Sequence, residues 1–291
     1  MDRPPIGPID NHRQREQGVL VYPVYSRRSQ GLSLGINLFP DRKRCTFDCP
    51  YCEVFPFERD KPFTQALMEA QLYGELEAAA RRGIAVKDIA FSGNGEPTLS
   101  PDFFRALKVA ARIRDEAAKE AALVLITNGT GLLERATFQA LRQAACGPAA
   151  LHIWLKLDAG TEAWYTRMAA SPVPWARLIP AMTAFTGCAP VTIQTMLCAI
   201  QGRPPPPEEA AAWERLVVTL AETGAAAAWA PGQARPGVTA VQLYGKARPA
   251  PRDPWTTALA PAYLEARAAA LKAALAAALV CTAPISIQVF P

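Results

Sequence analysis

The chain has 291 residues, of which half are apolar, and a formal net charge of +5, so it can bury a substantial core. It has no dense Lys/Arg tract, and the charge alone does not favour a nucleic-acid-binding protein. Residues 1–18 lack the apolar stretch of a signal peptide, and the Ala-rich run 263–280 is interrupted by charged residues. Seven cysteines, an odd number, fit reduced thiols better than a disulfide scaffold. We therefore expect a cytoplasmic protein without a membrane segment.

From residue 34 onward, short apolar runs alternate with segments of helical length, which indicates repeated βα units and a parallel sheet. We expect strands at 34–38, 88–92, 123–127, 151–157, 191–197 and 239–244, and a further one at 284–290. Helices are expected at 64–82, 101–120, 133–144, 174–186, 207–223 and 261–279, several with proline in the first turn. Six βα units favour an α/β partial (β/α)6 barrel, open and TIM-like, with a doubly wound sheet as the alternative.

The expected domain organisation follows from this reading. Residues 1–32 form an N-terminal extension, residues 33–250 form the partial barrel, and residues 251–291 add a helix and a strand that pack on it. Alternation along three strands places polar residues on one face, which would point into the barrel and suggests a ligand cavity. The residues expected on this inward face are His152, Trp154, Lys156 and Asp158, then Thr192, Gln194, Met196 and Cys198, and finally Gln242, Tyr244 and Lys246.

The densest chemical signal is the run Cys45-Thr-Phe-Asp-Cys49-Pro-Tyr-Cys52. Its C-x3-C-x2-C spacing can hold three corners of one iron–sulfur cube and leave the fourth iron without a protein ligand. A zinc site would need a fourth ligand, and the histidines stand far away in the sequence, at positions 12 and 152. A ferredoxin-like carrier would need a fourth spaced cysteine, whereas Cys146, Cys188, Cys198 and Cys281 are scattered. Zinc and purely structural roles stay open as alternatives.

The cysteine loop, with Tyr51 before the last cysteine and a strand before the loop, resembles the signature of the radical S-adenosylmethionine superfamily. Residues 93–96, Gly-Asn-Gly-Glu, are similar to its Gly-Gly-Glu motif, with Asn94 in place of the first glycine. Residues 127–129, Thr-Asn-Gly, also look like a motif of this family. Residues 26–37 and 243–249 resemble a subgroup of iron–sulfur oxidoreductases related to wyosine (tRNA) synthetase.

The resemblance implies a [4Fe–4S] cluster on Cys45, Cys49 and Cys52, with S-adenosylmethionine bound at its open iron. It implies reductive cleavage of that cofactor to a 5′-deoxyadenosyl radical, which abstracts hydrogen from a substrate. An external one-electron donor of the flavodoxin or ferredoxin type is then needed. The substrate is not identified by the sequence, and tRNA is the first specific expectation.

We expect cofactor contacts from Tyr51, Asn94, Gly95, Glu96, Asn128, Lys156, Asp158 and Gln194. Weaker expectations for substrate contacts are Arg27, Arg28, Tyr244 and Arg248, the last two because they end a barrel strand. Each assignment has a structural alternative. Glu96 and Asn128 could serve only their turns, Lys156 and Asp158 could pair with each other, and the two arginines at 27 and 28 could form salt bridges.

Two other functions remain compatible with the sequence. One is a non-enzymatic iron–sulfur or zinc protein that transfers electrons or has a structural role. The other is a radical activase that modifies a polypeptide.

Overall fold

The computed structural model describes residues 19–54, 56–229, 234–250, 253, 255–279 and 284–291. Its chain divides into two compact units: residues 1–45, 56–126 and 149–151 form the first, and residues 46–55, 127–148 and 152–291 form the second. His12 and Cys281, and most of the expected N-terminal extension, lie outside the described residues. The domain boundaries expected near residues 32 and 250 stay a prediction.

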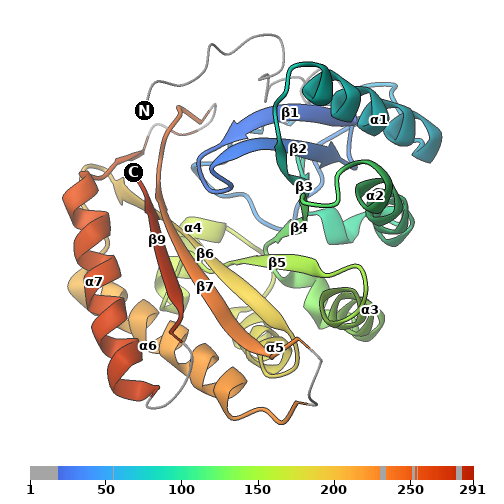
Figure 1. The fold of residues 1–291 in the computed structure, drawn as a ribbon. Helices are drawn as coiled ribbons and strands as arrows, with labels where there is room; N and C mark the ends of the chain where they lie inside the picture. The colour runs from blue at the N-terminus through green and yellow to red at the C-terminus, as the bar shows by residue number, and fades with distance from the viewer. Residues whose placement is uncertain (1–18, 55, 230–233, 251–252, 254, 280–283) are drawn as a thin grey trace. The chain divides into compact units, whose positions relative to one another are not determined.

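The first unit contains a sheet with two helices (Figure 1). Its strands are β1 (Val21–Ser26), β2 (Gly31–Asn37), β3 (Val86–Ser92) and β4 (Ala122–Thr127), and its helices are α1 (Gln65–Arg81) and α2 (Phe103–Ala117). Strand β1 is antiparallel to β2, whereas β2 and β3, and β3 and β4, run parallel. Phe91 and Phe103 meet edge to face in the core between β3 and α2, with ring centroids 5.3 Å apart.

The second unit contains β5 (Leu151–Lys156), β6 (Pro190–Ile200), β7 (Gly237–Gly245) and β9 (Ser286–Phe290), which pair in this order and run parallel. The short β8 (Thr256–Ala258) pairs antiparallel with the end of β6. Its helices are α3 (Arg135–Cys146), α4 (Glu162–Ala169), α5 (Trp175–Thr186), α6 (Pro207–Ala225) and α7 (Pro261–Ala278). Helices α6 and α7 pack on β7, and α7 also packs on β9.

All six expected βα strands and all six expected helices are present, and the last expected strand is β9. The sequence reading missed β1, α4 and β8. Strand β1 contains Pro23, which an edge strand tolerates because one side of its backbone needs no partner. Helix α4 has only eight residues, too few to show a helical period clearly.

The polar face expected on the strands of the second unit is present as a row of side chains in register. Lys156 is paired with Gln194, Gln194 with Gln242, and Gln242 with Gln288. The amides form a chain, because Gln194 Nε2 donates to Gln242 Oε1 at 2.7 Å and Gln242 Nε2 donates to Gln288 Oε1 at 3.1 Å. His152, by contrast, is exposed to solvent.

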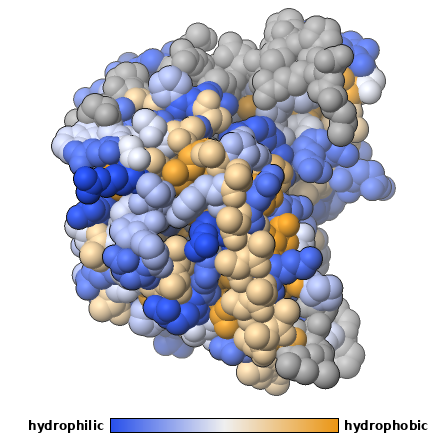
Figure 2. All heavy atoms as spheres, turned by 90° about the vertical axis from the view of Figure 1, so that its left-hand side faces the viewer, coloured by the Kyte–Doolittle hydropathy of each residue, from blue (hydrophilic) through white to orange (hydrophobic). Residues whose placement is uncertain are grey.

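Helix α7 buries Leu264, Leu271 and Leu275 and exposes alanines on its outer side. In Figure 2, the face turned to the viewer shows this alanine-rich surface of α7 as a light-orange column. Within the described residues, no helix combines the length and the apolar character that crossing a bilayer requires.

Candidate cofactor site

In the first unit, the residue before Cys45 is bonded to the turn that follows β3. Arg44 N donates to Asn94 O at 3.1 Å, and Glu96 N donates to Arg44 O at 2.8 Å. A Cβ atom on Gly95 would lie 1.8 Å from Arg44 O, so this close approach of two backbone segments requires glycine. The start of the cysteine loop and the Gly-Asn-Gly-Glu turn are therefore fixed to each other.

Asn94 is fully buried, and its side chain helps to form this turn. Its Nδ2 donates to Phe39 O at 3.0 Å, and its backbone N–H donates to Asn37 Oδ1 at 3.2 Å. The left-handed conformation is adopted by Gly93, with φ of 115°, so position 94 can carry a side chain. This explains how asparagine replaces the first glycine of the family motif. Asn37 itself was missed, although a polar residue at the end of a buried strand is a signal for such a site.

Glu96 is 2% exposed and stands at the start of the 3₁₀ turn Pro97–Leu99. Its Oε1 accepts hydrogen bonds from Thr98 N at 3.2 Å and from Thr98 Oγ1 at 2.7 Å. The turn-capping role is thus present in the structure. It also fixes the orientation of a buried carboxylate, which is a suitable acceptor for an ammonium group.

In the second unit, the residue after Cys45 is bonded to the turn that follows β4. Asn128 Nδ2 donates to Thr46 Oγ1 at 3.0 Å, and Asn128 Oδ1 accepts from Thr130 N at 3.0 Å. Thr46 Oγ1 and Thr130 Oγ1 are 2.8 Å apart. Gly129, with φ of 80°, provides the left-handed residue of the turn. Asn128 therefore does not need that conformation, and its side chain makes the contacts with Thr46 and Thr130.

The next residues of the cysteine loop rest on α4 and on the connection that follows it. Asp48 N donates to Ala169 O at 2.7 Å, and Ser171 Oγ donates to Thr46 O at 2.8 Å. The Phe47 ring meets Tyr165 edge to face, with centroids 5.7 Å apart. The loop is therefore anchored before Cys49 by backbone and aromatic contacts.

Cys49 and Cys52 belong to the second unit and form a tight turn, in which Cys52 N donates to Cys49 O at 3.0 Å. Cys45 is the last residue of the first unit's opening segment, and all three side chains are half-buried. Burial raises the pKa of the Cys49 thiol to about 12, although the nearby Lys156 opposes the shift. Three thiols in one short loop are the donor type that iron–sulfur clusters use, so the residue types and their spacing fit such a cluster. Among the described residues, no group of three or more His, Cys, Asp or Glu side chains is already gathered around a metal position.

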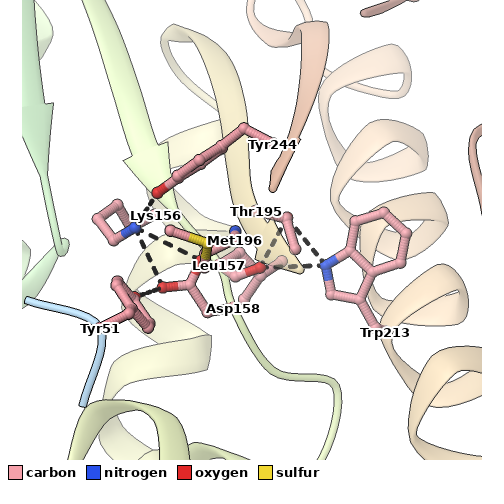
Figure 3. A network of polar contacts seen from close by, with 8 residues as sticks. All are labelled: Tyr51, Lys156, Leu157, Asp158, Thr195, Met196, Trp213 and Tyr244. Carbon is pink, nitrogen blue, oxygen red and sulfur yellow. Dashed lines mark hydrogen bonds and ion pairs between the residues drawn. The ribbon is translucent and has the colours of Figure 1, made fainter. Parts of the chain in front are cut away.

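Tyr51, between these two cysteines, is connected to the end of β5 by a buried network (Figure 3). Tyr51 donates to Asp158, Lys156 Nζ lies 3.1 Å from Asp158 Oδ2, and Lys156 donates to the hydroxyl of Tyr244 at 2.5 Å. Met196 N donates to Asp158 Oδ1 at 2.7 Å. Four of the expected site residues, Tyr51, Lys156, Asp158 and Tyr244, are thus brought together, and the mutual pairing of lysine and aspartate is observed.

The charges of this network stabilise one another. Burial alone would lower the pKa of Lys156, but the Asp158 carboxylate and Tyr244 outweigh it and raise that pKa. Burial and the negative charge of Asp158 raise the pKa of Tyr51 well above its ordinary value, so the phenol stays protonated and can donate. The ammonium of Lys156 also lies 5.2 Å from the ring centroids of both tyrosines.

The remaining expected residues have other surroundings. Gln194 belongs to the amide chain in register with Lys156. Arg248 Nε lies 2.8 Å from Glu53 Oε2, so its side chain is paired next to the cysteine loop, where sequence reasoning had not singled out the glutamate. Arg27 and Arg28 lie half-buried in the turn between β1 and β2 of the first unit. Cys198 is 1% exposed, consistent with a core residue.

Residues 42–197, more than half of the chain, match the Radical SAM superfamily. A radical SAM methyltransferase from Sphaerobacter thermophilus has a TM-score of 0.59 at 15% identity, over 92% of this chain and 67% of that one. SuiB of Streptococcus suis, solved with bound S-adenosylmethionine, has a TM-score of 0.53 at 13% identity, over 84% and 44% of the two chains. These likenesses confirm the expected fold class, an α/β partial barrel. The doubly wound alternative is not supported.

A protein of Helicobacter pylori named only as a UPF0026 protein is 28% identical over 122 residues, which is 42% of this chain. The match spans 38% of the length of that relative.

Proposed function

The chain belongs to the Radical SAM superfamily and is an enzyme, and we propose that it abstracts hydrogen from its substrate with a 5′-deoxyadenosyl radical. The cofactors of this superfamily are a [4Fe–4S] cluster and S-adenosylmethionine. When bound, they supply the electron, the sulfonium that is cleaved and the adenosyl radical. Family membership removes the non-enzymatic electron-transfer and structural roles from the functions that the sequence left open.

In this proposal Cys45, Cys49 and Cys52 are the cluster ligands. The observation that carries it is the anchoring of their loop on two sides. Arg44 is bonded to the turn of Glu96 within the first unit, and Thr46 is bonded to Asn128 within the second. A short loop with three thiols and backbone fixed on either side of the first cysteine supports a cluster-binding role.

The buried polar groups near the loop are proposed to bind S-adenosylmethionine. The carboxylate of Glu96 would accept hydrogen bonds from the methionyl ammonium, with Asn94 and Gly95 shaping its turn. Lys156 would face the methionyl carboxylate. Asp158 would accept hydrogen bonds from the ribose hydroxyls, and Gln194 would accept them or donate them. Asn128 would fix the loop, and Tyr51 would cover the cluster while its hydroxyl orients Asp158.

Substrate contacts are proposed for Tyr244 and Arg248 in the second unit and for Arg27 and Arg28 in the first. The enzyme requires a reductant, proposed as a flavodoxin- or ferredoxin-like protein in the cytoplasm. We propose tRNA as the first substrate class to test, with a polypeptide substrate as the alternative. Binding of total tRNA that weakens steeply with salt would support the first class, and absence of binding at low salt would contradict it.

The proposed cofactor chemistry is tested by anaerobic reconstitution with iron and sulfide. The reduced protein should show the electron paramagnetic resonance signal of a [4Fe–4S] cluster, and adding S-adenosylmethionine should change that signal. With dithionite present, 5′-deoxyadenosine and methionine should form in equal amounts when no substrate is added. A protein that binds cluster but gives neither the spectral change nor 5′-deoxyadenosine would contradict the proposal.

A further inference from the structure

The backbone that carries Asp158 continues as residues 157–161 from β5 toward α4, and helix α6 packs against it. Trp213 of α6 is 4% exposed, and its indole nitrogen is the donor in two contacts (Figure 3). Nε1 donates to Leu157 O at 3.1 Å and to Thr195 Oγ1 at 3.1 Å. Thr195 Oγ1 in turn donates to Leu157 O at 2.8 Å. The carbonyl immediately before Asp158 therefore accepts two hydrogen bonds.

A second residue of α6 fixes the other side of Asp158. Glu209 is 5% exposed, and its two carboxylate oxygens accept from Gly160 N at 2.5 Å and from Thr161 Oγ1 at 2.6 Å. Burial raises the pKa of Glu209, while these hydrogen bonds oppose the shift. A Cβ atom on Gly160 would lie 2.0 Å from Trp213 N, so glycine permits the close approach of this segment to α6.

The Asp158 carboxylate, which lies between the contacts of Trp213 and Glu209, is restricted to a narrow range of positions. Leu157 N donates to Gln194 O at 2.9 Å, and Met196 N donates to Asp158 Oδ1 at 2.7 Å, so β6 fixes the same segment from its side. Tyr51 of the cysteine loop donates to the other oxygen of Asp158. Displacement of residues 157–161 would therefore move the acceptor of Tyr51 and the partner of Lys156 together.

We infer that Trp213 and Glu209 are positioning residues, which hold residues 157–161 so that Asp158 faces Tyr51 and Lys156. Neither residue belongs to the cysteine loop or ends a barrel strand, and both act through the backbone on either side of Asp158. The inference rests on the proposed function for its catalytic consequence, but its structural part does not require activity.

The structural part is tested by amide hydrogen exchange in the protein without cofactors. Trp213→Phe keeps an aromatic ring, although a smaller one, and removes the donor, and Glu209→Gln replaces one acceptor by an amide that faces another donor. Each should raise exchange in peptides covering residues 157–161 and in the loop of Tyr51 by about fivefold to tenfold, the effect of losing about one hydrogen bond. Leu220→Ala, two turns along α6, is the control for general loosening of the helix.

The control should loosen α6 without selectively affecting these two segments. The inference would be overturned if Trp213→Phe and Leu220→Ala gave the same exchange pattern. It would also be overturned if residues 157–161 and the loop of Tyr51 exchanged as in the wild type in both Trp213→Phe and Glu209→Gln. These outcomes do not depend on whether the protein cleaves S-adenosylmethionine.

The catalytic consequence is tested by a double-mutant cycle on 5′-deoxyadenosine formation by the reconstituted enzyme. If Trp213 acts through Asp158, Trp213→Phe should lower kcat/KM for S-adenosylmethionine by about tenfold in the wild-type background and by less than threefold in an Asp158→Asn background. If the factors by which the two substitutions lower kcat/KM simply multiplied in the double variant, action through Asp158 would be refuted. If the wild-type enzyme formed no 5′-deoxyadenosine, the proposed function would fail, and the exchange experiment would decide the positioning role by itself.

Discussion

Replacing Gly95 by alanine should break the junction between the cysteine loop and the turn of Glu96. The new Cβ would lie 1.8 Å from Arg44 O and 2.6 Å from its carbonyl carbon, so the backbone must move. The hydrogen bonds from Arg44 N to Asn94 O and from Glu96 N to Arg44 O would be lost or stretched. Two backbone hydrogen bonds at about 1 kcal/mol each, together with strain, give a loss of about 3 kcal/mol in the free energy of unfolding.

The chain offers a matched control for this change. Gly74 lies in α1 with no atom within 4 Å of an added Cβ, so Gly74→Ala should stabilise the protein by about 1 kcal/mol through helix propensity. Urea unfolding followed by circular dichroism measures both midpoints in the cofactor-free protein. The same Gly→Ala change should thus act in opposite directions at the two positions. A Gly95→Ala midpoint equal to wild type, or equal losses in both variants, would refute the packing argument.

Two further predictions concern groups whose partners are known. Asp253 and Lys246 form a buried pair at 2.7 Å, so Asp253→Asn should lower the free energy of unfolding by about 3 kcal/mol, as measured by urea unfolding at neutral pH, because the lysine keeps its hydrogen bonds to Thr256 but loses its counter-charge. Burial opposes ionisation of Asp253, but the hydrogen bonds from Lys246 and its neighbours outweigh it and lower its pKa. The contribution of ionised Asp253 to the free energy of unfolding is therefore complete above the ordinary aspartate pKa of about 3.9. As pH falls below that value, the unfolding free energies of the wild type and the variant should converge. A difference between them that persists in acid would contradict this. Asn128→Ala removes the donor to Thr46 and should lower stability by about 2 kcal/mol and reduce the iron retained after desalting, whereas unchanged iron retention would show that this contact does not support the loop.

The regular elements could be predicted from sequence because their hydrophobic patterns are strong and each helix follows its strand in a repeated order. The fold class followed from that order. Strand β1 and helix α4 were missed for local reasons, a proline in an edge strand and a length of eight residues. Their existence depends on packing against neighbours, which local pattern does not report.

The candidate site was partly accessible in the same way. The cysteine spacing, the polar face of β5 and the turn after β3 are short-range signals that can be read along the chain. The contacts of Arg44 with Glu96 and of Thr46 with Asn128 join residues far apart in sequence, so they follow only from the fold. Trp213 and Glu209 were not recognised because, on an amphipathic helix, a buried tryptophan and a glutamate in the first turn are ordinary packing and capping residues.

The central claim is that the three cysteines of residues 45–52 carry the cofactor chemistry. It is tested most directly by 5′-deoxyadenosine formation in two reconstituted and reduced variants, Cys45→Ala/Cys49→Ala/Cys52→Ala and the control Cys146→Ser/Cys188→Ser. The control changes two half-buried cysteines on α3 and before β6, so cysteine content falls without altering the loop. We predict that the control retains wild-type formation and that the triple variant has none above background. Equal formation by the triple variant and the wild type, or loss in the control alone, would contradict the account.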